Sequence, residues 1–432
     1  MRLTPGKPFS AMKQPATFWG GLGALALLAL GGTASAQGIA APPTGGNGFK
    51  VGSGRLHPYF DLETRLDSGV GYFSPTSNAE PTSDPVSGNL SGDVALRFRP
   101  GFRLEIPSST MAFNLGANLD YVMYTGLMTK NSSAASRMEG AADLNARFNP
   151  DAPLTLEVSN QFARSDRTRT AAVGVGVLSL FNEARVKTPW RPGGGALELT
   201  PSVAYAVEFF QPLSSVSPVG CTESVCDPAA VERFDYGNLR VGAEGRWRFL
   251  PKTAVVLDTS LDVRSYFNDS TPDATLLRAM GGVAGLVSPK VAVTAKAGWG
   301  QNLGSTGGGT FLGQLEGTYL YSPTLSFKAG YLRTLEPVAA YGFFTDNRGY
   351  GEVRALFGGK LTVSGGLAVD FLRFDGGRKD TVVGVNIGPE YQFYPWLTGA
   401  AGYMLGRRSS SVDGGGLNYS RHEGYARLSV TY

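Results

Sequence analysis

From Leu56 to its last residue the chain repeats one unit: an amphipathic strand, a short turn rich in proline or glycine, a second strand and a longer polar loop. Connections that alternate in length are typical of antiparallel strands with the long loops at one end and the short turns at the other. The short turns lie near residues 106–108, 149–151, 191–193, 250–252, 288–290, 322–324, 358–360 and 394–396. The longer loops lie at residues 74–89, 129–136, 165–177, 213–233, 268–275, 304–310, 339–347, 376–381 and 408–420. These connections predict about eighteen strands, an even number as in bacterial single-chain barrels.

The strands of this unit have one apolar and one polar face. In residues 239–249 the odd positions are apolar or small, whereas the even positions include Arg240, Glu244, Arg246 and Arg248. A lysine or arginine that faces lipid at the bilayer midplane costs about 2–4 kcal/mol, so we expect the charged rows to face a wet lumen. The predicted lumen-lining residues are Asp93, Arg97, Arg99, Arg240, Glu244, Arg246, Arg248, Asp258, Asp262, Arg264, Glu352 and Arg354. An antiparallel sheet with one face in bulk water would show the same alternation, but not the regular strand length.

The last stretch, residues 424–432, alternates apolar and polar residues up to a terminal aromatic residue. A hydrophobic edge strand at a free chain end invites aggregation, and pairing with the first strand of a barrel removes both edges. The stretch resembles the C-terminal signal of bacterial outer-membrane barrels. This resemblance implies that Leu428, Val430 and Tyr432 serve barrel closure and recognition by the barrel-assembly machinery. The alternative is the last strand of a soluble β-sandwich.

Composition and the N-terminus favour the membrane alternative. Charged residues are 17% of the chain and hydrophobic residues 42%, and after the N-terminal segment no apolar run reaches the roughly 18 residues of a spanning helix. Residues 1–36 have the features of a secretory signal: basic Arg2, Lys7 and Lys13, an apolar stretch and a small-residue cleavage site. Removal of these three residues takes away most of the formal net charge of +4.

These observations together predict an all-β fold, a transmembrane antiparallel up-and-down β-barrel in the lipid of the bacterial outer membrane. We expect a signal peptide at residues 1–36, a flexible leader rich in glycine, proline and alanine at residues 37–54, and the barrel at residues 55–432.

Aromatic residues gather beside the expected connections. Those near the short turns are Trp190, Trp247, Phe249, Tyr321, Tyr394 and Trp396. Those near the long loops are Tyr72, Phe73, Tyr124, Phe209, Phe210, Phe267, Tyr341, Phe343 and Phe344. We expect two interfacial girdles, although aromatic residues also favour strands in general.

Few residues carry chemistry. Cys221 and Cys226 lie in the longest loop, and in an exported chain they are expected to form a disulfide rather than a metal site. The two histidines, His57 and His422, would come close to each other if the first and last strands pair. The chain contains no motif of a serine hydrolase, a phosphate-binding loop, a metalloprotease or a calcium loop, and no basic patch for nucleic acid. We expect no catalytic residues, no metal, no cofactor and no enzyme activity.

The start of the expected barrel, Gly-Arg-Leu-His-Pro-Tyr-Phe-Asp-Leu-Glu-Thr-Arg-Leu-Asp-Ser at residues 54–68, resembles the opening of the β-barrel porin type 2 group. Members of this length in myxobacterial-type systems accompany Wzx/Wzy-dependent exopolysaccharide secretion. The resemblance implies a passage for exopolysaccharide that acts with a periplasmic polysaccharide-export protein. The alternatives are a general or substrate-selective porin, a structural or adhesive barrel with a plugged lumen, and a barrel hydrolase.

The cysteine pair provides the first testable prediction. Because the loop it closes is short, the disulfide is expected to stabilise the chain by at most about 2–3 kcal/mol. Protein purified without reductant should contain no free thiols in a thiol-labelling assay, and Cys221→Ser should leave the barrel assembled. Free thiols in such a preparation would contradict the disulfide.

Overall fold

The computed structural model describes residues 48–70, 91–128, 136–166, 177–212, 234–268, 271–304, 307–338, 342–411 and 418–432. These residues form one 19-stranded sheet and a short 3₁₀ helix, η2 (Pro192–Gly194). The strands are β1 (Phe49–Val51), β2 (Gly54–Val70), β3 (Ser91–Ile106), β4 (Met111–Tyr124), β5 (Arg137–Phe148), β6 (Leu156–Ser165), β7 (Val177–Lys187), β8 (Leu197–Pro212), β9 (Tyr236–Leu250), β10 (Thr253–Tyr266), β11 (Ala274–Ser288), β12 (Val291–Asn302), β13 (Gly309–Ser322), β14 (Leu325–Val338), β15 (Gly342–Phe357), β16 (Leu361–Phe374), β17 (Lys379–Tyr394), β18 (Leu397–Ser410) and β19 (Tyr419–Thr431). No helix within the described ranges is long and apolar enough to cross a membrane.

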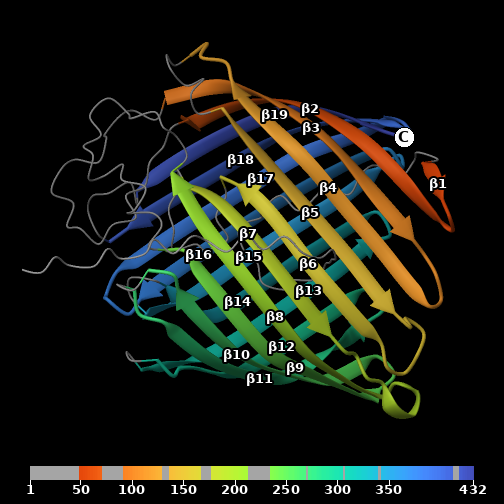
Figure 1. The fold of residues 1–432 in the computed structure, drawn as a ribbon, viewed down its shortest axis with the longest axis vertical. Coiled ribbons are helices and arrows are strands. Elements are labelled where there is room, and N and C mark those ends of the chain that lie inside the picture. The colour runs from red at the N-terminus through yellow and green to blue at the C-terminus, as the bar shows by residue number, and fades with distance from the viewer. Residues whose placement is uncertain are drawn as a thin grey trace, which may run out of the picture.

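The sheet closes on itself. Each strand from β2 to β19 pairs antiparallel with the next, and β19 pairs antiparallel with β2 from Glu423–Asp67 to Thr431–Tyr59, so that the described residues form a closed barrel of 18 strands (Figure 1). The expected fold class and strand number are confirmed. Closure pairs the backbone groups of both terminal strands, which otherwise would have no partner in lipid.

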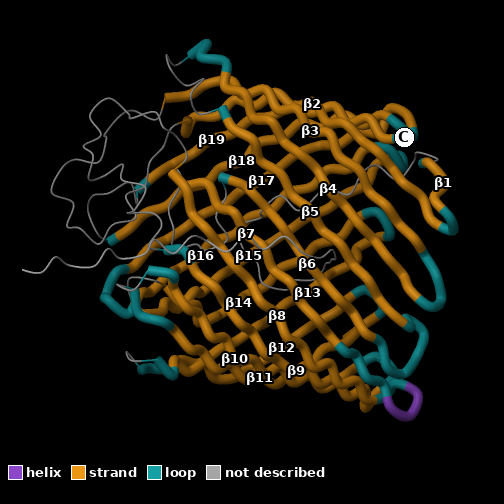
Figure 2. The backbone as a smooth tube through the Cα atoms, viewed as in Figure 1, coloured by secondary structure: helices purple, strands orange, loops and turns teal. Residues whose placement is uncertain are grey.

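The strands are long enough to span a bilayer obliquely. The 18 strands of the barrel, β2 to β19, range from 10 residues in β6 to 17 residues in β2, whereas a strand tilted by about 45° needs roughly 9–11 residues. The strands form a continuous wall and the connections lie at its two ends, with β1, the C-terminus and the turn of η2 at the same end (Figure 2). We call this end the short-turn end and the opposite one the long-loop end.

Two of the expected long loops are wrong. β17 begins at Lys379 and pairs with β16 from there, inside the loop expected at residues 376–381. The sequence analysis placed a long loop at residues 339–347, but β14 continues to Val338 and β15 begins at Gly342. Phenylalanine, threonine and aspartate at positions 343–346 pair in register with β14 and β16, so this connection at the long-loop end is short. Length therefore sorts most connections between the two ends, but not all of them.

The expected leader ends in a strand. β1 pairs antiparallel with the start of β2, and the ring of Phe49 lies 4.6 Å from the ring of Tyr432, centroid to centroid. The backbone N–H of Tyr432 donates to the carbonyl oxygen of Pro58 at 3.0 Å. The terminal aromatic residue is thus held both by β2 and by β1 at the short-turn end.

The outer face is apolar. Leu62, Leu257 and Leu428 are 40%, 54% and 51% exposed although each lies in the middle of a paired strand. Leucine side chains exposed in this way at alternate positions around a closed sheet suit contact with lipid acyl chains. An apolar outer face of this kind is the lipid-facing surface of a transmembrane barrel.

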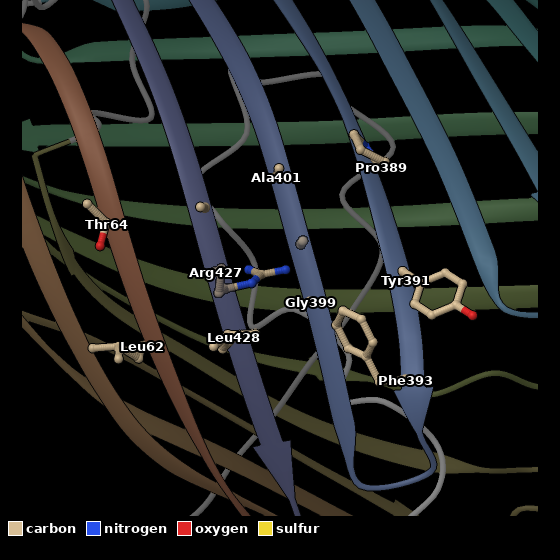
Figure 3. A pocket seen from close by; sticks show the side chains of 11 residues that line it. Leu62, Thr64, Pro389, Tyr391, Phe393, Gly399, Ala401, Arg427 and Leu428 are labelled. Carbon is tan, nitrogen blue, oxygen red and sulfur yellow. The ribbon is translucent and has the colours of Figure 1, made fainter.

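A shallow groove crosses this outer face over β17, β18, β19 and β2 (Figure 3). Its floor includes Gly399, and its sides are formed by Tyr391 and Phe393 at one edge and by Leu62 and Leu428 at the other. The groove exists because small residues on β18 and β19 leave a gap between larger outward side chains.

The aromatic residues follow the prediction at one end only. Those near the short turns are exposed: Trp190, Trp247, Phe249, Tyr321, Tyr394 and Trp396. At the long-loop end Phe209 and Phe267 are exposed and stack with ring centroids 5.5 Å apart. Tyr124, Phe210 and Phe344 are buried, so their assignment to the outer girdle is wrong. Tyr72, Phe73 and Tyr341 lie outside the described residues.

Closure by β19 leads to a prediction about assembly. Removal of residues 421–432 would leave β18 and β2 each with an unpaired edge, so the barrel should not close. We expect loss of the heat-modifiable, fast-migrating form on gels and loss of the chain from outer-membrane fractions, with a partial loss for Tyr432→Ala. Unchanged amounts of the assembled form after the truncation would contradict the role of β19.

Candidate functional site

Ion pairs between side chains of non-neighbouring strands identify the inner face of the barrel. Arg97 on β3 reaches Glu139 on β5 at 3.1 Å, past β4. Arg421 on β19 reaches Asp166, just after β6, at 3.2 Å. Side chains of non-neighbouring strands converge only on the concave side of a curved sheet. On each strand, the row of residues that carries these charges therefore points inward. The alternate row, which carries the exposed leucines, points outward.

A buried ionic network covers the inner face of β2 to β5. The guanidinium of Arg97 lies 2.6 Å from Asp120 and 4.0 Å from Glu63, in addition to its contact with Glu139. Arg99 shares the Asp120 carboxylate at 2.7 Å. All five side chains are nearly inaccessible to solvent. Opposite charges arranged in this way satisfy each other where water is scarce.

The same network crosses the seam between the first and last strands of the barrel. Arg65 on β2 contacts Glu63 at 2.6 Å and Glu423 on β19 at 2.9 Å. Arg421 on β19 contacts Asp67 on β2 at 2.7 Å. The seam is therefore held by charged side chains on its inner side as well as by backbone hydrogen bonds.

Asp93, one of the predicted lumen residues, anchors a loop. It is fully buried, and its carboxylate accepts hydrogen bonds from the backbone N–H groups of Gly126 at 2.8 Å and Met128 at 3.1 Å. The carboxylate ties the connection after β4 to the start of β3.

The part of the wall formed by β7 to β12 carries further ion pairs and hydrogen bonds. Asp262 accepts from Arg240 at 2.5 Å and lies 3.5 Å from Arg278. Asp258 on β10 pairs with Lys296 on β12 at 2.5 Å, past β11. Glu244 lies 3.8 Å from Lys187. The fully buried Glu208, which the sequence analysis missed, accepts from the hydroxyl of Tyr236 at 2.6 Å and from Ser179 at 2.5 Å.

Ten of the twelve predicted lumen residues fall into two groups along the barrel, and the other two, Arg240 and Asp258, are half-buried. Asp93, Arg97, Arg99, Asp262 and Arg264 are buried, and they lie toward the long-loop end of their strands. Glu244, Arg246, Arg248, Glu352 and Arg354 are exposed, and they lie toward the short-turn end. The predicted charged residues are thus shielded from solvent in the long-loop half of the inner wall and exposed to solvent in the short-turn half.

Several charged residues that the sequence analysis did not select belong to the same site: Asp61, Glu63, Arg65, Asp67, Asp120, Glu139, Glu208, Arg421 and Glu423. A signal for some of them was present, because Asp61, Glu63, Arg65 and Asp67 alternate along β2 with apolar residues. Alternation identifies the inward row, but it does not identify the partner on another strand.

The two histidines do not meet. His57 lies by the end of the seam where Thr431 pairs with Tyr59, and its Nδ1 is 3.2 Å from the carbonyl oxygen of Tyr432. His422 lies by the other end and contacts the hydroxyl of Tyr403 at 2.6 Å. The expected proximity is wrong because the antiparallel register puts the start of β2 opposite the end of β19.

No group of three His, Cys, Asp or Glu side chains within the described ranges could hold a metal ion. Cys221 and Cys226 lie outside the described residues, so their disulfide stays a prediction.

Comparison with known proteins was made for sequence and for structure. No model of a protein family matches the chain, and no curated protein matches it. The chain is similar in structure to the siderophore receptor PirA from Pseudomonas aeruginosa, with a TM-score of 0.44 and 10% identity over 88% of this chain and 80% of that one. It is also similar to the outer membrane protein OpdK from Pseudomonas aeruginosa, with a TM-score of 0.45 and 11% identity over 87% of this chain and 98% of that one.

The structure itself supports the class of protein. A closed antiparallel barrel with apolar residues outside and paired charges inside is the architecture of a bacterial outer-membrane β-barrel. The resemblance of residues 54–68 to the β-barrel porin type 2 group stays an expectation.

The Arg97 cluster yields a prediction for stability. Arg97→Met would leave Asp120, Glu139 and Glu63 close together with one cation fewer, and loss of a partner from a buried pair typically costs about 3–5 kcal/mol. We expect a clearly lower temperature for loss of the heat-modifiable form. Arg147→Met is the matched control, because Arg147 is 46% exposed in its pair with Glu157 and exposed pairs contribute about 0–1 kcal/mol. Equal shifts for both variants would contradict a stabilising role of the buried network.

Proposed function

We propose that the chain forms a passage for hydrophilic solutes across the outer membrane. The observation that carries this proposal is the exposed charged wall in the short-turn half of the barrel, at Arg246, Arg248, Glu352 and Arg354. Barrels of 16–18 strands enclose more space than their inward side chains fill, and that space is an aqueous channel unless something plugs it. Exposed arginine and glutamate on the inner face keep such a space wet.

The signs of the inner charges bear on the solute class. Cations and carboxylates alternate around the wall, as in the pairs Asp258–Lys296 at 2.5 Å and Lys328–Glu316 at 3.1 Å. Paired charges of both signs do not strongly favour one ion, but they present many hydrogen-bond donors and acceptors. Hydroxyl-rich solutes such as sugars fit this wall best.

The second candidate is the export of exopolysaccharide, with a periplasmic polysaccharide-export protein as partner. Two observations favour it: the resemblance of residues 54–68 to the β-barrel porin type 2 group, and the position of the exposed polar half at the short-turn end. Short turns face the periplasm in bacterial barrels, so a periplasmic partner would meet the open half of the lumen. We propose no hydrolytic role for this wall.

Proteoliposome swelling tests the passage. Vesicles that contain the purified full-length barrel should swell in monosaccharides and disaccharides, and more slowly as the sugar grows, because a water-filled pore of fixed width sorts solutes by size. Vesicles that contain the chain without residues 421–432 serve as the control for leakage by an unassembled protein. No swelling above that control would contradict the passage.

Deletion of the gene separates the two candidates. If the passage serves polysaccharide export, one surface polysaccharide should disappear while its synthesis enzymes stay active, and the full-length chain supplied in trans should restore it. Normal surface polysaccharide in the deletion strain, with no second barrel of this kind present, would leave the porin as the function.

A further inference from the structure

The long-loop end of β14 leaves the barrel wall. In the sheet, β14 is separated from β11 by β12 and β13, so at the usual strand spacing of about 4.8 Å the two should lie about 14 Å apart. Cα atoms of β14 nevertheless come within 8 Å of Cα atoms of β11. We call residues 335–338 of β14 and 342–344 of β15 the inward hairpin, because the contacts described next place them over the lumen.

Two arginines, one on β10 and one on β11, hold the inward hairpin. Arg264 on β10 donates from Nη1 to the carbonyl oxygen of Pro337 at 3.1 Å, and its guanidinium lies 3.9 Å from the ring centroid of Tyr236. Arg278 on β11 lies 3.7 Å from Glu336. Both arginines belong to inward rows, since Arg278 also contacts Asp262. The hairpin therefore approaches β10 and β11 from the inside of the barrel.

An apolar cluster holds it as well. Leu335 of the hairpin packs with Leu276 on β11 and Leu312 on β13, and these three side chains are 0%, 0% and 1% exposed. Met280 and Phe343 pack against the same cluster. Complete burial of these leucines removes apolar surface from water and therefore stabilises the position of the hairpin.

The inward hairpin is also fixed to β16. Val338 and Phe344 pack with Leu372 and Phe374, and the rings of Phe344 and Phe374 lie 5.2 Å apart. Beside them Gly308 has a φ of +106°, and a Cβ at that position would lie 3.1 Å from the ring of Phe343. Glycine lets the connection before β13 pass close to the hairpin. The inward hairpin is thus held by contacts with β10, β11, β13 and β16.

We propose that the inward hairpin is the fixed constriction of the passage and that Arg264 and Leu335 are the positioning residues that hold it. This inference rests on the proposed function, since a constriction has meaning only in a passage. Apolar packing on both sides makes it a rigid element rather than a flap. Its charges are paired, with Arg278 against Glu336, so it sorts hydroxyl-rich solutes by size rather than ions by sign.

The test uses the full chain in two measurements. Single-channel conductance in planar bilayers is recorded for the natural chain and for a variant in which residues 336–344 are replaced by Gly-Gly, with heat-modifiability as the check that the barrel is assembled. Removal of the constriction should raise the conductance about twofold or more, because the narrowest part of a pore sets its resistance. Glu336→Gln should shift the ion preference toward anions and Arg278→Gln toward cations.

Hydrogen exchange is the second measurement and does not depend on conductance. Backbone amides of Leu335, Glu336 and Val338 should exchange faster in Arg264→Gln and in Leu335→Ala than in the natural chain. Arg354→Gln is the matched control, since Arg354 is exposed on the same inner face near the short-turn end and contacts no part of the hairpin. Exchange elsewhere in the barrel should not change.

The outcomes are distinct. A channel whose conductance is the same with and without the hairpin overturns the constriction and leaves the passage standing. An assembled barrel that neither conducts nor swells overturns the proposed function, and the constriction with it. Unchanged exchange at residues 335–338 in both variants overturns the assignment of Arg264 and Leu335, whatever the conductance.

Discussion

The structure depends on the pairing of every backbone N–H and C=O group within the membrane. Lipid offers no hydrogen-bond partner, and an open sheet would leave one edge of β2 and one edge of β19 unpaired. Closure along the register from Glu423–Asp67 to Thr431–Tyr59 removes both edges. Once the sheet is closed, strand alternation assigns each residue either to lipid or to the lumen, and the composition of each row follows from that assignment.

The inner wall has a buried half and an exposed half. Toward the long-loop end, arginines and carboxylates such as Arg97 and Asp120 are buried against each other, and the inward hairpin adds leucine and phenylalanine packing. Toward the short-turn end, Arg246 and Arg354 are exposed. Buried pairs are strongly disrupted when one partner is lost, whereas exposed charges cost little to change. In the proposed passage, the exposed charged residues of the short-turn half can therefore vary without loss of the fold.

Sequence reasoning predicted most of the fold because two local signals determine it. Proline and glycine end the strands at short turns, such as those at residues 251–252 and 323–324, and alternation with period two separates the faces. Both signals lie within a few neighbouring residues, so no knowledge of distant contacts is needed. The strand number and the closure by β19 follow from them.

The site could be predicted only in part, because its contacts depend on register and curvature. Alternation marks Arg97 as inward, but its three carboxylates come from β2, β4 and β5. Leu335 belongs to the row of β14 whose Phe327 and Tyr331 are exposed on the outer face, and only the departure of the strand end toward β11 buries it inside the barrel. His57 and His422 were expected to be neighbours because the strands were known to pair but their register was not.

The charged seam has a consequence for the order of folding. Arg65 and Glu423 are 358 positions apart in the sequence, and Arg421 and Asp67 are 354 apart. Contacts of such separation form late, after the entropy of closing the intervening chain has been lost. A sheet that lacks only its last pairing would hold Arg65 and Arg421 without these carboxylates in a partly enclosed interior. Arg65 would keep Glu63 on its own strand, so the missing contacts are those of Arg65 with Glu423 and of Arg421 with Asp67. Docking of β19 on β2 forms both contacts at once, and the final step of closure is therefore cooperative.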